Sequence, residues 1–324
     1  VLLWSFTAIT LGTALAWRDA GGGDVGGYLV AVAIGVLLQG LVAHSVNEIA
    51  DWRSGTDRDP APRVISGGSK VIASGLLGPR ALAWTGAAAA AAAAALGLVA
   101  AARWGWVLVL YGLGGLAGAV LYTLPPVRAA YRPFGGEAVA FACIWGCVTG
   151  AYVLQRGTLS GAAALVGIAY ASSCVAMLMM HHYLDRGPDS RAFPPKTTTI
   201  VLLGRPGRRY AVAWAAIALA GAALLAARAD AAFAVLAALL AVALLLHATV
   251  DPDDPAGVTR AELGVIVAGM AGGLGTAALL APPLAWALVA AAVLVPLELA
   301  LSGVAHRDLA AERARLARAR AGPG

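Results

Sequence analysis

Long runs of apolar residues recur along this whole chain, and they restrict its fold more than any other feature. Ten windows each approach the roughly 20 apolar residues that a helix needs to cross a bilayer. They cover residues 2–17, 26–46, 80–102, 104–122, 135–155, 159–183, 210–227, 231–249, 261–281 and 284–303. Only 12% of the residues are charged, whereas soluble domains average about 25%.

Helices are the expected form of these windows, because a helix satisfies its own backbone groups in lipid. The strand alternation of a membrane barrel is absent. We therefore predict an all-α fold, a polytopic membrane helical bundle of nine to ten transmembrane helices. We favour ten, because an even number keeps both chain ends on one side; a re-entrant hairpin at the Ala-Pro-Pro break near Pro282 is the alternative. The first window lacks the charged start and cleavage site of a signal peptide, so we expect it to be the first membrane helix.

Positive charges are unequally distributed among the connections between the windows. The connections after the second, fourth and sixth windows are rich in Arg and Lys, whereas those after the first, third, fifth and seventh hold one Arg each: Arg18, Arg103, Arg156 and Arg228. Because basic loops stay in the cytoplasm, we expect a multi-pass protein of the cell membrane with both chain ends inside. Residues 1–303 form the transmembrane domain, and residues 304–324 form a basic cytoplasmic tail. The net charge of +6 follows from these loops, and nothing indicates a nucleic-acid partner.

Both long connections on the predicted inner side begin with acidic residues at helical spacing. Asn47 and Asp51 are four residues apart, and so are Asp185 and Asp189. Residues four apart share a helix face, although Gly187 and Pro188 interrupt the second spacing. Acidic groups at a membrane boundary are unfavourable unless something positive lies between them.

Mg²⁺ is the cation that this pattern favours, because it binds one or two carboxylates together with substrate phosphates. We therefore predict that the two acidic clusters hold Mg²⁺ on a diphosphate. Basic residues of the same layer would take the remaining phosphate charge; they are Arg63, Lys70, Arg128 and Lys196. The apolar interior suits a lipid tail attached to that diphosphate.

Five polar segments between or at the ends of the windows carry a resemblance to a known family. They are NEIADWRSGTD (47–57), SGGSKVIASGLLGPR (66–80), LYTLPPVRAAYRPFGGE (121–137), GAYVLQRGTLS (150–160) and LDRGPDSRAFPPKTTTIVLLG (184–204). Together they resemble the UbiA superfamily of intramembrane prenyltransferases over about residues 1–300. The fourth segment is similar to a stretch of the menaquinone-forming branch, which prenylates 1,4-dihydroxy-2-naphthoate.

The resemblance implies a bundle of helices around a central cavity, capped by the two aspartate segments. Such enzymes bind a polyprenyl diphosphate through Mg²⁺, ionise its allylic C–O bond and attach the carbocation to an aromatic acceptor. The implied metal ligands are Asn47, Asp51, Asp57, Asp185 and Asp189, with Asp51 and Asp185 foremost in catalysis. Arg63, Lys70, Arg128 and Lys196 are the implied diphosphate contacts. Tyr122 is expected near the reacting carbon, where its ring would stabilise the cation.

The acceptor end of the predicted site departs from the family pattern. Glu48 replaces the usual Asp, Leu184 precedes Asp185, and Pro-Pro-Lys replaces the usual Gly-Lys. Glu137 and His182 are our candidates for contacting the acceptor. Their alternative roles are those of a helix-start acid favoured by the helix dipole and of a hydrogen-bonding residue at a helix end.

Two other functions stay open on the sequence. A terpene cyclase of the same superfamily would ionise the diphosphate and need no acceptor. A secondary transporter would show charged or broken helices at mid-membrane and two related halves, whereas the acids here gather at one boundary. We favour prenyl transfer to an aromatic acceptor of the quinone-precursor type.

Overall fold

The computed structural model describes residues 2–56, 71–73, 75–297 and 300, and this part of the chain contains helices and no strand. The elements are α1 (Leu2–Ala20), α2 (Val25–Gly35), the π-helix η1 (Val36–Ala43), α3 (His44–Ser54), α4 (Pro79–Trp104), α5 (Leu108–Leu121), the 3₁₀ turn η3 (Ala129–Tyr131), α6 (Gly135–Arg156), α7 (Gly161–Arg191), α8 (Thr199–Leu203), α9 (Gly207–Arg228), α10 (Phe233–Thr249), α11 (Pro255–Leu280) and η4 (Pro282–Leu284). An apolar helical stretch, Pro282–Leu297, follows α11. The prediction of an all-α fold is confirmed.

Six of the described helices are long and apolar enough to cross a membrane: Val25–Ser54, Pro79–Trp104, Gly135–Arg156, Gly161–Arg191, Gly207–Arg228 and Pro255–Leu280. The first of these joins α2, η1 and α3 into one helix. Three shorter apolar helices accompany them: Leu108–Leu121, Phe233–Thr249 and Pro282–Leu297. With α1, the described part of every window predicted from the sequence falls mainly on a helix. The chain is thus a polytopic membrane bundle. The tail at 304–324 lies outside the described residues.

The two helices that carry the acidic spacings extend beyond their apolar windows. The helix through η1 and α3 ends only at Gly55, whose φ of +87° is a left-handed conformation open to glycine. Helix α7 continues to Arg191 with Pro188 inside it. The expectation that Gly187 and Pro188 interrupt this helix was therefore wrong. Backbone hydrogen bonds from Ala192 and Lys196 to the carbonyl of Asp189 secure its last turn.

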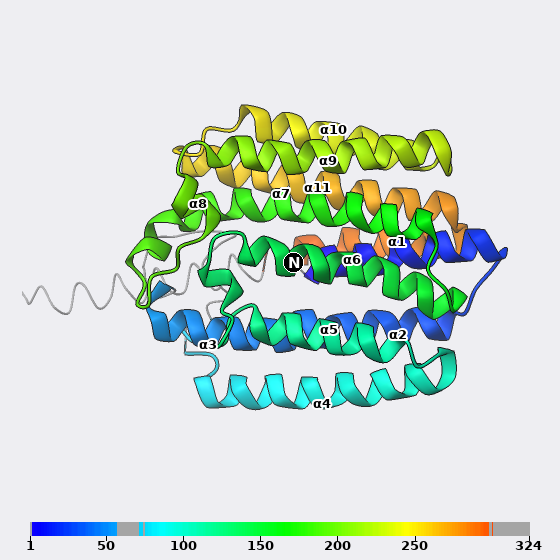
Figure 1. The fold of residues 1–324 in the computed structure, drawn as a ribbon, viewed down its shortest axis with the longest axis horizontal. Helices are drawn as coiled ribbons and strands as arrows, with labels where there is room; N and C mark the ends of the chain where they lie inside the picture. Colours follow the sequence, from blue (N-terminus) through cyan, green and yellow to red (C-terminus); the bar gives the residue numbers. More distant parts are fainter. Residues whose placement is uncertain (1, 57–70, 74, 298–299, 301–324) are drawn as a thin grey trace, which may run out of the picture.

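The helices lie side by side along one direction, so that their ends form two opposite ends of the molecule (Figure 1). Helix α7 packs against α6, α9 and α11, and α1 packs against α6 and α11. Helix α7 is the most enclosed span, with 83% of its apolar window buried. The ends of α3 and α7 lie at the same end of the bundle, together with α8 (Figure 1).

Small residues allow this close packing. A Cβ atom at Gly12 of α1 would collide with the carbonyl oxygen of Val148 of α6. A Cβ at Gly269 of α11 would collide with the ring of Trp4. Backbones that approach this closely are typical of helices packed in lipid.

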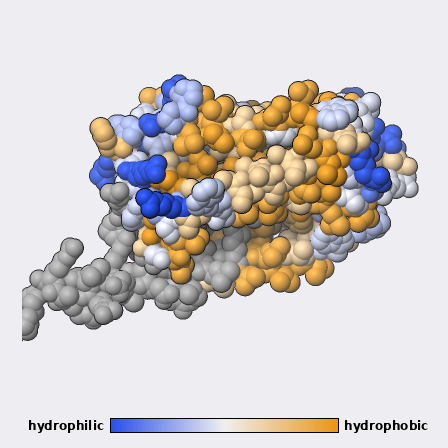
Figure 2. Space-filling view, turned by 90° about the horizontal axis from the view of Figure 1, so that it is seen from below, coloured by the Kyte–Doolittle hydropathy of each residue, from blue (hydrophilic) through white to orange (hydrophobic). Residues whose placement is uncertain are grey.

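The outer surface of the bundle suits a bilayer. Figure 2 shows apolar side chains across the middle of the molecule and hydrophilic ones towards both ends. Large apolar side chains are freely exposed on it, among them Trp84, Leu110 and Val289, at 77%, 69% and 67%. An exposed apolar surface of this extent marks a lipid contact rather than a water contact.

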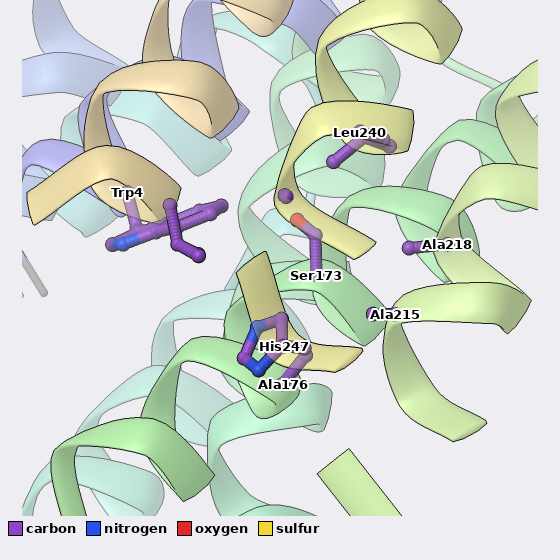
Figure 3. A pocket seen from close by; sticks show the side chains of 9 residues that line it. Trp4, Ser173, Ala176, Ala215, Ala218, Leu240 and His247 are labelled. Carbon is purple, nitrogen blue, oxygen red and sulfur yellow. The ribbon is translucent and has the colours of Figure 1, made fainter. Parts of the chain in front are cut away.

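A small cavity of about 10 Å³ lies between α1, α7, α9, α10 and α11 (Figure 3). It is lined by Trp4, Ser173, Ala176, Ala215, Ala218, Leu240, Ala243, His247 and Val265. Its volume matches about one water molecule, so it is not the space for a prenyl chain. The central cavity implied by the family resemblance stays a prediction.

Candidate functional site

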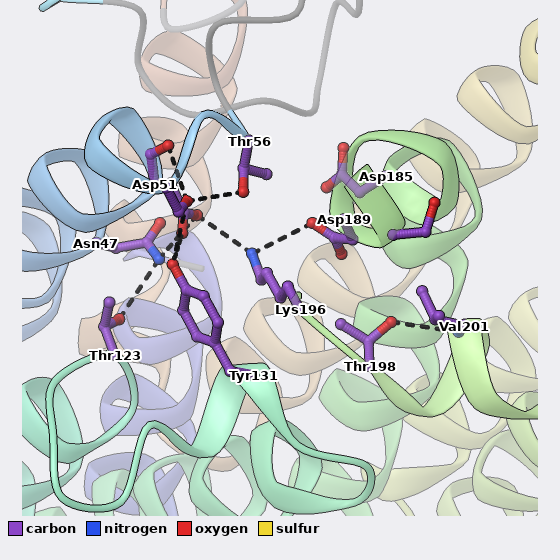
Figure 4. Close-up of polar contacts among 12 residues, drawn as sticks. Asn47, Asp51, Thr56, Thr123, Tyr131, Asp185, Asp189, Lys196, Thr198 and Val201 are labelled. Atoms are coloured by element: carbon purple, nitrogen blue, oxygen red, sulfur yellow. Dashed lines mark hydrogen bonds and ion pairs between the residues drawn. The ribbon is translucent and has the colours of Figure 1, made fainter. Parts of the chain in front are cut away.

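Two segments far apart in the sequence meet at one end of the bundle (Figure 4). The first is the end of α3, and the second comprises the end of α7 and the connection leading to α8. The backbone N–H of Phe193 in the second segment donates to the carbonyl of Ser54 in the first, with N and O 3.0 Å apart. A backbone hydrogen bond therefore joins the two segments that carry the acidic residues.

Asp51 is the centre of the first segment and is only 4% exposed. Its Oδ2 accepts hydrogen bonds from Asn47 Nδ2 and from Lys196 Nζ, each at 3.2 Å. Its Oδ1 accepts from the hydroxyl of Tyr131 at 2.9 Å. Asn47 also reaches Thr123 Oγ1, at 3.4 Å. Asn47 and Asp51 thus share one helix face, as the spacing predicted.

Asp189 is the most enclosed acid of the second segment, with an exposed fraction of 0%. Its Oδ1 lies 3.6 Å from Lys196 Nζ, which is an ion-pair distance but too long for a hydrogen bond. Neither carboxylate oxygen has a hydrogen-bond partner among the described residues. Because buried polar atoms normally have a hydrogen-bond partner, these two oxygens are candidates for contacting a ligand.

Lys196 lies between the two segments and links them (Figure 4). Burial of its ammonium group lowers its pKa, but the carboxylates of Asp51 and Asp189 outweigh that effect and hold the pKa well above its ordinary value. The lysine is therefore a fixed cation between two acids. The sequence predicted Lys196 as a diphosphate contact. In the structure its ammonium group lies between Asp51 and Asp189.

Tyr131 is a site residue that the sequence did not single out. Burial first, and the charge of Asp51 second, raise its pKa to about 12, so its hydroxyl stays a hydrogen-bond donor. The Arg128 guanidinium carbon lies 5.9 Å from the centre of the same ring, and Lys196 Nζ lies 5.7 Å from it. An aromatic residue among arginines in a polar connection was the only available signal.

Tyr122, the predicted tyrosine, lies near the same charges. Lys196, Asp51 and Glu137 all act electrostatically on its hydroxyl. Its ring faces the start of α6, where a Cβ at Gly136 would be 3.7 Å away. Asp57, Arg63 and Lys70, the other predicted ligands of the first segment, lie outside the described residues.

The two candidate acceptor residues are both buried near this end. Glu137, in the first turn of α6, is 3% exposed, and its Oε1 has no hydrogen-bond partner in the described chain. His182 of α7 is 5% exposed, and its Nδ1 is also without a partner there. Both side chains could receive a polar ligand, but no contact links either to Lys196.

Next to His182, His181 lies between two carboxylates. Its Nδ1 is 2.8 Å from Glu262 Oε1 of α11, and its Nε2 is 3.4 Å from Asp185 Oδ2. Asp185 thus lies beside a histidine, and its charge also acts on Lys196. Glu262 was not predicted, because its helix carries no other acid and lies far from the motifs in the sequence.

The acids do not form a ready-made metal cage. Within the described residues, no three His, Cys, Asp or Glu side chains converge as metal ligands. Lys196 stands between Asp51 and Asp189 instead. Asn47, Asp51 and Asp189 nevertheless supply oxygen donors of the kind that Mg²⁺ prefers.

A comparison with known families decides the classification. The model of the UbiA prenyltransferase family matches residues 5–263. The chain belongs to this family. It is therefore a prenyltransferase and a multi-pass membrane protein.

Solved structures of UbiA homologues have the same fold. The apo structure of a UbiA homologue from Aeropyrum pernix K1 has a TM-score of 0.66 at 17% identity, over 85% of this chain and 96% of that one. A UbiA homologue from Archaeoglobus fulgidus, solved with DMAPP and Mg²⁺, has a TM-score of 0.58 at 12% identity, over 84% and 96%. A digeranylgeranylglyceryl phosphate synthase has a TM-score of 0.54 at 12% identity, over 83% and 92%. No protein of curated function matches the sequence.

One UbiA-like segment of the sequence lies far from the site. The stretch that resembles the menaquinone-forming branch ends α6 at the opposite end of the bundle. There the hydroxyl of Tyr152 donates to Asp19, and the side chain of Gln155 bonds Trp17 and the backbone of Asp24. In this structure the stretch ties helices together, so it carries no information about the acceptor at the site.

Proposed function

We propose that this UbiA protein transfers a polyprenyl group from its diphosphate to an aromatic acceptor of the quinone-precursor type, with Mg²⁺. The observation that carries the proposal is the position of Lys196 between Asp51 and Asp189. That geometry concentrates buried negative charge from two helices around one cation, at the boundary of an apolar bundle. The printed ligands of the Archaeoglobus fulgidus homologue, DMAPP or GPP with Mg²⁺, support the same class of donor.

The residues present fit a magnesium ion. Asn47, Asp51 and Asp189 would hold it, with Asp185 of the same helix face as Asp189. The oxygens of Asp189 have no hydrogen-bond donor among the described residues, and only Oδ1 lies within ion-pair distance of Lys196. When bound, Mg²⁺ would neutralise the diphosphate as it leaves. Because Lys196 already offsets the charge of the two acids, we expect metal and diphosphate to bind together. The negative diphosphate would then draw the lysine towards itself.

The chain's own residues account for the remaining requirements of the reaction. The allylic C–O bond breaks, and its electron pair leaves with the diphosphate, which Lys196 and Arg128 stabilise. Tyr131 holds the Asp51 carboxylate in place through its hydroxyl. Tyr122 offers a ring face to the allylic cation. The apolar helices keep water away until a ring carbon attacks and the ring loses its proton.

The acceptor is the finer part of the proposal. Glu137 and His182 are buried near Tyr122 and Asp185, and each has a polar atom without a partner in the described chain. We propose that they contact the hydroxyl or carboxyl groups of the aromatic acceptor. A hydroxylated aromatic acid offers groups that both side chains can bind.

The test is a donor and acceptor matrix on purified protein in nanodiscs with Mg²⁺. Geranyl and geranylgeranyl diphosphate would each be offered with 1,4-dihydroxy-2-naphthoate, with glycerol-phosphate lipid or with no acceptor. Mass spectrometry would follow product and released diphosphate. We expect a prenylated aromatic product that requires both acceptor and Mg²⁺. Asp51→Asn should lower turnover about 100-fold or more, whereas Asp230→Asn, at the opposite end, should not.

Each other result has a defined meaning. Product from the donor alone would replace transfer with cyclisation, and a prenylated glycerol-phosphate lipid would replace the aromatic acceptor. If no pair releases diphosphate and Asp51→Asn leaves donor binding unchanged, the assignment of the site is wrong.

A further inference from the structure

His181 connects the second aspartate segment to a helix that none of the sequence motifs includes. It lies on α7, one helical turn before Asp185, and its ring reaches α11. Nδ1 is 2.8 Å from Glu262 Oε1, and Nε2 is 3.4 Å from Asp185 Oδ2. The two ring nitrogens thus point to two different carboxylates, from two different helices.

The hydrogen-bond partner that the structure gives to Glu262 is His181. The Glu262 side chain is 1% exposed, and burying a carboxylate is unfavourable unless a partner compensates for it. His181 is that partner at Oε1, while Oε2 has no hydrogen-bond partner among the described residues. A buried acid that touches a histidine on the next helix is an orienting group.

The arrangement matches a known way of fixing a ligand. Where histidine ligands bind metals, a carboxylate behind the ring fixes its orientation, and losing that partner weakens metal affinity or activity by about 10- to 100-fold. Here the ring, held from behind by Glu262, faces a carboxylate. Asp189 is placed by Lys196, so the two acids of the second segment have separate supports.

We propose that His181, oriented by Glu262, is a positioning residue that sets the direction of the Asp185 carboxylate for the metal–diphosphate complex. The inference rests on the proposed function, because it assumes that Asp185 contributes to that complex. His181 itself touches neither substrate nor metal. Helix α11 thereby becomes part of the donor site through Glu262.

The experiment measures binding rather than turnover. Protein in nanodiscs would be titrated with Mg²⁺ at a fixed concentration of geranyl S-thiolodiphosphate, an unreactive donor analogue, and bound analogue would be measured. The variants are His181→Gln, Glu262→Gln and the double variant. The control is His247→Gln, which replaces a histidine of α10 that is remote from His181 in sequence and fully buried. Thermal unfolding of each protein would be recorded in parallel.

We expect the Mg²⁺ concentration for half-maximal binding to rise about tenfold or more in His181→Gln, and in the same direction in Glu262→Gln. The double variant should need no more Mg²⁺ than His181→Gln, because both changes interrupt the same chain of contacts from Glu262 through His181 to Asp185. His247→Gln should leave the Mg²⁺ requirement unchanged. Glu262→Gln keeps the shape of the side chain and no longer buries a charge, so it should fold even if a His181 variant does not.

The failures can be told apart. If the unaltered protein binds the analogue without any need for Mg²⁺, the proposed function fails before any variant is considered. If the unaltered protein needs Mg²⁺ but Glu262→Gln keeps the same requirement, the positioning role is overturned. A lower unfolding temperature with an unchanged Mg²⁺ requirement would likewise reduce the pair to a structural contact.

Discussion

Lys196 is the residue on which the candidate site depends most. It is 8% exposed and has a carboxylate on either side, from α3 and from α7. A buried charge pair contributes little net stability, but removing one partner leaves the other uncompensated. In the metal-free site, the lysine therefore compensates for the buried charges of Asp51 and Asp189.

Lys196→Gln should destabilise the metal-free protein by about 3 to 5 kcal/mol, because two buried carboxylates lose their cation. Mg²⁺ should restore part of this loss, since it can take the same position between the acids. Thermal unfolding in detergent, with EDTA or with Mg²⁺, measures both effects. Equal Mg²⁺ responses in the variant and in the unaltered protein would contradict the view that the lysine substitutes for the metal.

Tyr131→Phe should lower kcat/KM about 10- to 100-fold, because a hydrogen bond to a charged group is worth about 1.5 to 3 kcal/mol. The phenylalanine ring keeps the contacts to Arg128 and Lys196, and the change removes only the hydroxyl, which donates to Asp51 and, at 3.3 Å, to Ser54 Oγ. Steady-state kinetics with the best donor and acceptor checks this. Tyr152→Phe removes a similar hydrogen bond, to Asp19 at the opposite end, and should leave kcat/KM unchanged.

The sequence predicted those site residues whose spacing along one helix places them on the same face. Asn47 with Asp51, and Asp185 with Asp189, follow from the spacing of four residues. Lys196 and Arg128 follow from the basic residues of the predicted inner layer and from the family resemblance. Tyr131, His181 and Glu262 could not be found this way. Their roles arise from contacts between helices, such as α7 with α11, and no spacing within one segment encodes such a contact.

At the scale of elements, the connections matter as much as the helices. In the turn between α10 and α11, Asp253 accepts hydrogen bonds from Arg186 at 2.8 Å and from Arg205 at 3.1 Å. Arg186 belongs to the end of α7, and Arg205 follows α8. This turn therefore fastens both ends of the second aspartate segment to the neighbouring helices.

At the opposite end, Asp24 caps α2 and joins it to other helices. Its Oδ1 accepts from the N–H of Gly27, and its Oδ2 accepts from Trp104 Nε1 at 2.9 Å. The hydrogen bond from Gly27 first, and the one from Trp104 second, hold the pKa of Asp24 below its ordinary value of 3.8. The folded protein therefore favours the charged form.

Asp24→Ala should destabilise the protein by about 1 kcal/mol at pH 7, the usual effect of losing a helix cap. A depressed folded-state pKa gives stability above the unfolded value of 3.8, which is lost as the pH falls through the folded value. The difference between variant and unaltered protein should therefore shrink below pH 3.8. Unfolding in detergent at pH 7 and pH 3 tests this, and Asp24→Asn, which keeps the cap, should lose only the pH dependence.

At the scale of the whole molecule, composition and window length were enough to predict the class of fold. Apolar windows located the helices because lipid leaves the backbone no alternative. They did not locate the helix ends at the site, where Asp51 and Asp189 continue the helices into polar surroundings. Those ends depend on tertiary contacts, such as that between Phe193 and Ser54.

The charges of the two ends make a prediction about orientation. The candidate site lies at the end that carries Arg128, Arg186, Lys196 and Arg205. The opposite end carries one arginine in the last turn of each of four helices: Arg18, Arg103, Arg156 and Arg228. From the positive-inside rule we predict that the site faces the cytoplasm.

This orientation can be tested with single cysteines in a chain whose Cys143, Cys147 and Cys174 are replaced by Ala. Thr158→Cys, at the opposite end, should react with an impermeant maleimide added to intact cells. Ser190→Cys, at the site end, should react only after the membrane is opened. Labelling in the reverse order would place the site on the outer face.

The π-helix η1 has a consequence for how this molecule tolerates change. A π-helix accommodates extra residues within a helix, and each residue in an α-helix turns the chain by about 100°. The eight residues of η1 precede Asn47 and Asp51 in the same span. Deleting one of them would leave a span of nearly the same length and hydropathy. It would nevertheless rotate the side chains of Asn47 and Asp51 away from Lys196. The number of residues in η1 therefore fixes the direction in which Asn47 and Asp51 point. Gain or loss of a single residue there would misplace both side chains, although the hydropathy of the span would hardly change.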